Sequence, residues 1–170
     1  CESHFYRGRI DSTFFYLEKI TTLTEQLQIP FMVLLSNYYS GRYHFYNGDH
    51  NSSVEHFNFL IENIPDDFDL SMRVVPKAFN SINYKNMGQP KRSLEYIDMI
   101  KNEIGKDDKF EEMEYYNILI QALEENNEQD LAKKYLLDAY DIIMQRSFKI
   151  KDRQLRNDFL EKNYWNLKIL

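Results

Sequence analysis

The sequence is poor in cysteine, glycine and proline, and it has no long apolar run. Among 170 residues there is one cysteine, Cys1, so no internal disulfide can form and a reducing compartment such as the cytoplasm suits the chain. No apolar stretch approaches the roughly 18 residues that a membrane-spanning helix needs, so we expect no membrane span. No charged-then-apolar signal segment opens the chain.

The chain begins at Cys1 without an initiator methionine, which favours a fragment or a processed product. A mature lipoprotein also begins on cysteine, but it usually continues with a flexible polar linker. Here the aromatic residues Phe5 and Tyr6 follow almost at once. We therefore expect residues 1–170 to form one domain that is part of a larger protein.

Two further absences concern chemistry. Each glycine falls in or near an expected turn or helix contact, so no glycine-rich phosphate loop is present. His44, His50 and His56 are six residues apart and lie on either side of a turn, so we expect them to hold no metal. Cys1 and His4 lack a third orienting group, and the paired carboxylates suit a solvated helix face. We therefore expect no enzymatic activity, no cofactor and no metal.

What is present is the composition of a folded helical protein. Apolar residues make up 43%, charged residues 28% and aromatic residues 15% of the chain. The formal net charge of −6 argues against direct nucleic-acid binding, because phosphate contacts draw on clustered lysine and arginine.

Apolar residues recur at helical spacing along the whole chain, and no strand-like alternation occurs. The spacing from Ser52 to Glu55 suggests a capping box at the start of one helix. Pro76 either kinks its helix or delays its start to about Val75. We expect an all-α fold with helices at about 12–28, 31–47, 52–64, 71–87, 90–104, 110–125, 129–146 and 153–170.

The expected turns fall about forty residues apart, and the residues that follow them agree. The four turn residues are Gly8, Gly48, Gly88 and Asn127. Five residues later all are small, namely Thr13, Ser53, Ser93 and Ala132. Nine and twelve residues later we expect buried positions, at Leu17, Phe57, Ile97 and Leu136, and at Ile20, Leu60, Ile100 and Ala139. A repeated helical hairpin is typical of a solenoid. Gly41, inside a helix, suggests a close approach by a neighbouring helix.

This pattern resembles the tetratricopeptide repeat. Gly41, Gly48, Ser53, Phe57 and Pro65 fit the small, turn, crossing, large and terminal positions of that family. The period is about forty instead of thirty-four, and Asn37 stands at the family's tryptophan position. Longer repeats of this kind look like those of MalT-like transcription activators and related multidomain ATPases. The stretch 155–170 is similar to a helix that often ends such arrays. The resemblance implies a right-handed superhelix of antiparallel hairpins, with about four repeats and a C-terminal capping helix.

The resemblance also implies a concave face lined by the first helix of each repeat. The first set on this face mixes aromatic surface with one arginine, which suits a peptide, but the same residues fit plain packing or contact with a neighbouring domain. The lysine and asparagine pattern of a carboxylate clamp is absent. The candidate groove residues are Leu35, Tyr38, Arg42, Phe45, Val75, Ala78, Ile82, Lys85, Glu114, Asn117, Gln121 and Glu124.

One basic run offers a second candidate surface. It could dock onto an acidic partner or a nucleic acid, although Asp152 and Asp158 interrupt it. Its residues are Arg146, Lys149, Lys151, Arg153 and Arg156.

The resemblance implies a cytoplasmic, non-catalytic module that binds a protein or peptide within a bacterial signalling or transcriptional regulator. Its partner could also be an effector domain in the same full-length chain. Two alternatives stay open. The chain could be the regulatory domain of a multidomain ATPase, cyclase or kinase, or a scaffold that forms homo-oligomers through its stacked ends.

Overall fold

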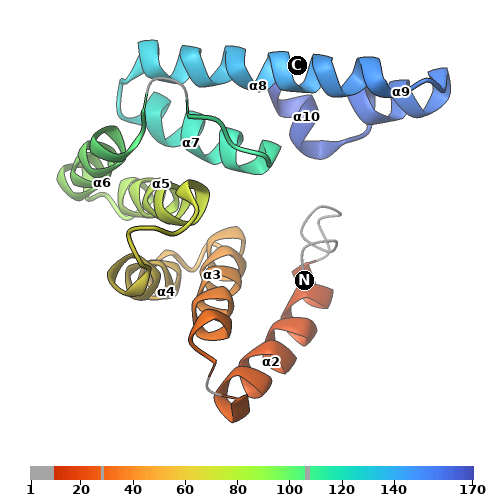
Figure 1. The fold of residues 1–170 in the computed structure, drawn as a ribbon. Helices are drawn as coiled ribbons and strands as arrows, with labels where there is room; N and C mark the ends of the chain where they lie inside the picture. The colour runs from red at the N-terminus through yellow and green to blue at the C-terminus, as the bar shows by residue number, and fades with distance from the viewer. Residues whose placement is uncertain (1–9, 28, 106–107) are drawn as a thin grey trace. The chain divides into compact units, whose positions relative to one another are not determined.

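The computed structural model describes residues 10–170, except 28, 106 and 107. These residues form α-helices and no strand, which confirms the all-α prediction. Cys1, His4, Gly8 and the side chain of Thr13 lie outside the described part. The helices are α2 (Ile10–Leu27), α3 (Pro30–Tyr46), α4 (His50–Asn63), α5 (Leu70–Asn86), α6 (Pro90–Glu103), α7 (Met113–Glu125), α8 (Gln129–Lys149), α9 (Arg153–Glu161) and α10 (Tyr164–Ile169) (Figure 1).

The chain divides into two compact units, residues 1–104 and residues 105–170. In the first unit, each helix from α2 to α6 packs against the next one along the chain. In the second unit, α7 packs against α8, and α10 contacts α7, α8 and α9. The expectation of one domain over residues 1–170 stays a prediction. No helix in the described ranges combines the length and the apolar character needed to cross a membrane.

The first unit repeats with a period of forty residues at the level of helix ends. α3 and α5 both contain 17 residues and begin at Pro30 and Leu70. α4 and α6 both contain 14 residues and begin at His50 and Pro90. The period inferred from the sequence therefore describes two hairpins, α3–α4 and α5–α6, whose helices have the same lengths.

The turn residues within the hairpins have the left-handed conformation. Gly48 has a φ of 76°, Gly88 of 71° and Asn127 of 63°, a region that glycine and asparagine tolerate best. In each turn the next residue donates its N–H to a carbonyl five residues earlier, as from Asp49 to His44 at 2.9 Å. These are Schellman caps, so the three turns predicted at these positions are confirmed.

The buried positions after each turn follow the prediction with two exceptions, of which the first is Ile20 on α2, a half-buried residue. Five and twelve residues after the turns, the side chains in α4, α6 and α8 are buried. Nine residues after the turns, Phe57 and Ile97 are buried but Leu136 is 36% exposed, so that prediction is wrong. Tyr135 is buried in its place. Ile120 stands where the other hairpins have Gly41 and Ser81, so the third crossing has no room for a second large side chain.

Several expected helix ends are corrected by capping side chains. Asp49 begins α4 by accepting a hydrogen bond from the Ser52 N–H at 3.2 Å, so the cap is not Ser52. The expected last helix is interrupted, because the Asn163 side chain caps a separate α10. α5 runs through Pro76 from Leu70, so its start is not delayed. α2 begins earlier, α7 begins later and α8 ends later than the sequence suggested.

The centre of the first unit is an aromatic stack. The rings of Phe57 and Phe79 lie 4.8 Å apart and nearly parallel, and both side chains are buried. A Cβ atom on Gly41 would lie 2.9 Å from the Phe57 ring. The close helix approach expected at Gly41 is therefore confirmed, and the ring of Phe57 is the group that approaches.

A chain of hydrogen bonds joins the two hairpins of the first unit. The Nδ1–H of His50 donates to the Oδ1 of Asn83 at 2.8 Å, and the Nδ2 of Asn83 donates to the Oγ of Ser53 at 2.8 Å. Ser53 in turn donates to the carbonyl of Gly41 at 2.9 Å. A satisfied buried network of this kind favours one register of α4 against α3 and α5.

A second polar cluster joins α4, α5 and α6. The Oδ1 of Asn58 accepts hydrogen bonds from Asn80 at 2.8 Å and from the hydroxyl of Tyr96 at 2.7 Å. Burial raises the pKa of Tyr96 from 10.0 to about 12, because the phenolate would lose hydration.

We expect the raised pKa of Tyr96 to make stability fall in alkali. The unfolded chain releases this proton near pH 10.0 and the folded chain only near pH 12, so the free energy of unfolding declines as pH rises between these values. Tyr96→Phe should unfold more readily at neutral pH, by about 1 kcal/mol for the lost hydrogen bond, but should show a shallower alkaline decline. Urea unfolding across this pH range measures both effects. Tyr140→Phe, at an exposed site, is the control for loss of a phenol, and an equal slope in Tyr96→Phe and the parent chain would contradict the prediction.

Candidate functional site

An open groove in the first unit is the candidate site. It has a volume of about 780 Å³ and is formed by α2, α3 and α4 with Pro65 from the segment that follows α4. This volume lies within the usual range for ligand sites. The lining residues are Thr21, Thr24, Pro30, Val33, Leu34, Ser36, Asn37, Phe59, Asn63 and Pro65.

The apolar part of the groove comes mainly from α3 and α4. Val33 and Leu34 lie in the first two turns of α3, which begins at Pro30 because proline needs no N–H partner there. Phe59 lies on α4 and is 39% exposed, although its neighbour Phe57 is buried. A large aromatic side chain that is left partly open beside a groove suits an apolar ligand group.

The polar part of the groove consists of side-chain amides and hydroxyls held in place. The Nδ2 of Asn37 donates to the carbonyl of Val33 at 2.9 Å, while its Oδ1 accepts from the Nδ1–H of His56 at 3.0 Å. The hydroxyls of Thr21 and Ser36 lie 3.2 Å apart. Because a primary amide has two N–H donors and two acceptor positions, Asn37 keeps hydrogen-bonding capacity for a ligand.

The histidine that orients Asn37 belongs to a stacked pair. The rings of His44 and His56 are 5.4 Å apart and nearly parallel, and the Nδ1 of His44 lies 3.1 Å from the Oδ2 of Asp49. Burial, with the nearby charge of His44 as a second cause, lowers the pKa of His56 below its usual value. The lowered pKa favours the neutral form of His56 beside Asn37.

None of the ten lining residues that the structure describes is ionisable, which suits an uncharged ligand segment. Of the three histidines considered from the sequence, His44 and His56 meet, whereas His50 is hydrogen-bonded to Asn83. Across the described ranges, no group of three or more His, Cys, Asp or Glu residues could hold a metal ion.

The groove predicted from the family resemblance is only partly open. Tyr38 is 2% exposed and Arg42 is 1% exposed, with the Arg42 guanidinium 5.3 Å from the centre of the Tyr38 ring. The Tyr38 ring contacts Phe57, and Ile82 is buried on α5 between α4 and α6. The prediction that these three side chains line an open groove is therefore corrected. They are packing residues, because neighbouring helices cover the faces on which they lie. Val75, Ala78 and Glu114 are buried too.

The other residues of that predicted groove lie at half-buried or exposed positions. Phe45 packs edge-on against Phe79 with ring centres 4.8 Å apart, and Leu35 is half-buried. Asn117 donates to the carbonyls of Met113 and Trp165, which joins α7 to α10. Lys85, Gln121 and Glu124 are exposed. As a single surface drawn from both units, the set stays a prediction.

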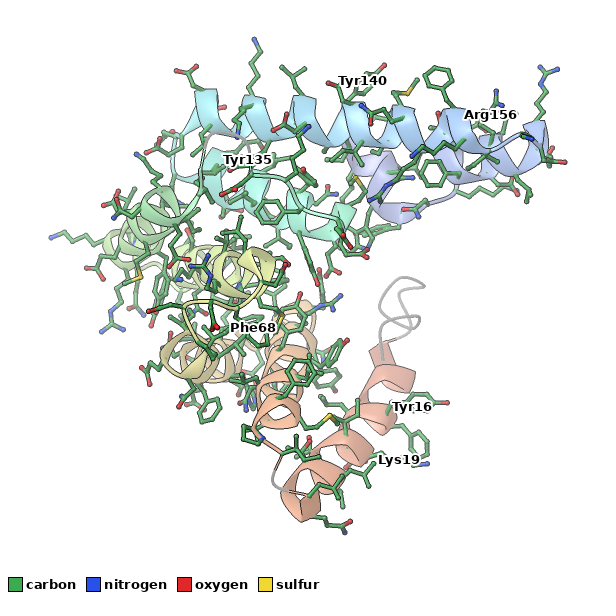
Figure 2. All side chains as sticks on the ribbon, in the orientation of Figure 1. Tyr16, Lys19, Phe68, Tyr135, Tyr140 and Arg156 are labelled. Atoms are coloured by element: carbon green, nitrogen blue, oxygen red, sulfur yellow. The ribbon has the colours of Figure 1, made fainter. Side chains whose placement is uncertain are left out.

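The predicted basic run is divided between structural and exposed residues. Arg146 donates to the carbonyl of Glu111 at 2.8 Å. Arg156, labelled in Figure 2, donates twice to the carbonyl of Ile150, at 2.6 and 3.0 Å. Both guanidinium groups therefore hold backbone segments in place. Lys149, Lys151 and Arg153 are exposed and remain candidates for docking.

Sequence reasoning missed the groove between α2, α3 and α4. One signal could have indicated it, since Phe59 is an aromatic residue off the apolar face that Val54, Phe57 and Leu60 define on α4. Which side of α3 stays open depends on how α2 and α4 pack around it. No local sequence pattern reports that packing.

Comparisons with known proteins add no information to these inferences. No family model, no curated protein and no solved structure matches this chain. The resemblance to tetratricopeptide repeats therefore depends on the repeat pattern and on the hairpins described above.

Proposed function

We propose that this chain is a non-catalytic helical-repeat module that binds an uncharged segment of a protein or peptide. The observation that carries the proposal is the groove of about 780 Å³ between α2, α3 and α4, whose ten described lining residues include no ionisable side chain. An apolar wall next to fixed amides suits a chain that offers apolar side chains and backbone N–H and C=O groups.

The wider architecture that we propose is a right-handed, tetratricopeptide-like superhelix that ends in a capping helix. The forty-residue repeat of helix ends and the three equivalent turns support it. We propose that the module belongs to a bacterial signalling or transcriptional regulator of the MalT-like kind. Ligand binding would then be relayed to an effector domain of the full-length protein.

In this proposal two groove residues contact the ligand in different ways, and a third lies next to them. Phe59 is the aromatic anchor for an apolar side chain, because burying its exposed part against a ligand removes apolar area from water. Asn37 pairs with a peptide amide, and its orientation is fixed by His56 and by the carbonyl of Val33. Asn63, whose Nδ2 donates to the carbonyl of Phe59 at 2.8 Å, lies on the same helix as the anchor.

We expect Phe59→Glu to weaken peptide binding by about tenfold or more, because a carboxylate would be desolvated in an uncharged groove. The probe is a peptide selected from a displayed library of random peptides against the intact chain, labelled and measured by fluorescence anisotropy. Glu55→Gln is the matched control, since it changes an exposed residue on the same helix and should leave binding unchanged.

Thermal unfolding followed by circular dichroism separates binding from folding in this experiment. Phe59→Glu should keep the melting temperature of the parent chain within a few degrees, because the side chain is partly exposed. The proposal fails if selection on the parent chain enriches no peptide beyond those that selection on Phe59→Glu enriches. It also fails if the selected peptide binds this variant as tightly as it binds the parent chain.

A further inference from the structure

The groove between α2, α3 and α4 runs along α3 and has two different ends. At the start of α3, the ring of Phe31 contacts the ring of Phe68, with centres 5.9 Å apart. The segment that follows α4 therefore lies at this end, together with the lining residue Pro65. Further along α3, the Oδ1 of Asn37 accepts a hydrogen bond from His56 of α4. We call the two ends of the groove the Pro65 end and the Asn37 end.

Exposed carboxylates lie at the Pro65 end. Glu62 belongs to the last turn of α4, and Asp66 and Asp67 directly follow Pro65. All three side chains are exposed, and within the described part of the chain none of them forms an ion pair. We call these three residues the acidic end. Asp69 is not included, because its side chain caps α5.

The helices that form the groove supply no exposed lysine or arginine to the acidic end. Residues 20–72 contain seven aspartates and glutamates but only one lysine or arginine, Arg42, whose side chain is 1% exposed. The last turns of α2 and α4, which end on this side of the groove, contain no basic residue. The three histidines of this range lie toward the other ends of α3 and α4.

The bases just outside that range do not compensate the acidic end either. Lys19 projects from α2 on the side away from α3 (Figure 2). Arg73 and Lys77 of α5 both pair with Glu103 of α6. Together with the Asp69 cap, this group on α5 and α6 has no net charge. Within the described part of the unit, the acidic end is therefore an excess of negative charge beside an uncharged groove.

We propose that the peptide segment bound in the groove carries a lysine or arginine next to its uncharged part, and that this cation lies at the acidic end. The inference rests on the proposed function, because it assigns the flank of the same ligand. The uncharged part occupies the lining, where a charge would lose its hydration. The cation stays at the exposed rim, where it can pair with carboxylates while both remain in water. Complementary charge at a rim adds specificity and speeds association.

The first experiment compares three displayed peptide libraries on the intact chain. The libraries share a random core without charged residues, and this core is flanked by lysines, by serines or by glutamates. We expect the strongest enrichment with lysine flanks and the weakest with glutamate flanks. Equal enrichment of the three libraries, or a preference for serine or glutamate flanks, overturns this inference and leaves the proposed function standing. Enrichment in none of the libraries overturns both.

The second experiment locates the cation with the most enriched lysine-flanked peptide, labelled and measured by fluorescence anisotropy. Asp66→Asn with Asp67→Asn should weaken its binding by about fivefold and make the affinity less sensitive to salt, because exposed ion pairs are individually weak and screened. Glu95→Gln with Asp98→Asn is the matched control, since it removes the same charge from exposed sites on α6, which does not line the groove. This control should leave binding unchanged.

A peptide with the same core and serine flanks separates the charge from the shape of the groove. Its affinity should be the same for the parent chain and for Asp66→Asn with Asp67→Asn, and thermal unfolding of the two proteins should agree within a few degrees. The inference is overturned if both double variants weaken the lysine-flanked peptide equally, or if neither does. It is also overturned if Asp66→Asn with Asp67→Asn weakens the serine-flanked peptide as much as the lysine-flanked one.

Discussion

Replacing Phe57 with alanine should lower the free energy of unfolding by about 3–5 kcal/mol. The ring is fully buried, it stacks on Phe79 with ring centres 4.8 Å apart, and it covers Gly41. Removing it leaves a cavity where α3, α4 and α5 meet, and the surrounding helices can fill that cavity only in part. The same ring stands at the large apolar position of the repeat, so its loss removes a central packing contact between the two helices of the hairpin.

Phe59→Ala is the matched control, because it removes the same side chain two residues away at a site that is 39% exposed. Urea unfolding followed by circular dichroism should give a much smaller loss for Phe59→Ala than for Phe57→Ala. The interpretation of the core would be refuted by equal losses in the two variants. Phe59→Ala should also lower the affinity for a selected peptide. This pair of variants therefore distinguishes a residue that binds the ligand from a residue that stabilises the fold.

Gly41→Val should destabilise the chain by about 2–3 kcal/mol, although glycine inside a helix is normally unfavourable. A Cβ atom at this position would lie 2.9 Å from the Phe57 ring, and that ring is held by Phe79. The added side chain therefore separates α3 from α4, and this cost exceeds the gain from replacing glycine.

A second change identifies the source of that cost. Phe57→Leu gives the new side chain more room, so the double variant Gly41→Val with Phe57→Leu should lose less stability than the sum of the two single changes. Urea unfolding of the four proteins measures this difference. Additive losses would mean that the cost of Gly41→Val does not come from the Phe57 ring.

The repeat could be predicted from the sequence because its signals are local. A left-handed turn favours glycine or asparagine wherever it occurs, so Gly48, Gly88 and Asn127 identify the hairpins without any knowledge of packing. The exposure of Leu136 depends on how α8 packs, which the repeat does not report. The cap of α10 is also local, because Asn163 accepts from the N–H groups of Trp165 and Asn166, but the repeat pattern does not include it.

The candidate site could be predicted much less well, for a physical reason. Helical spacing reports which residues share a face, but it does not report whether a neighbouring helix covers that face. Tyr38 and Arg42 have the composition of a binding surface and are buried. Phe59 has the composition of a core residue and is partly open, because α2 and α4 leave a groove beside it.

The matching of Gly41 with Phe57 has a consequence for how this chain can change in length. In the next hairpin the equivalent pair is Ser81 with Ile97. The smallest residue, Gly41, stands in the hairpin with the large Phe57 ring, and the larger Ser81 stands in the hairpin with the smaller Ile97. Each block of forty residues therefore has its own matched pair where its two helices cross. The contacts between hairpins have to be formed anew at each junction, and they include the stack of Phe57 on Phe79 and the hydrogen bonds from His50 through Asn83 to Ser53.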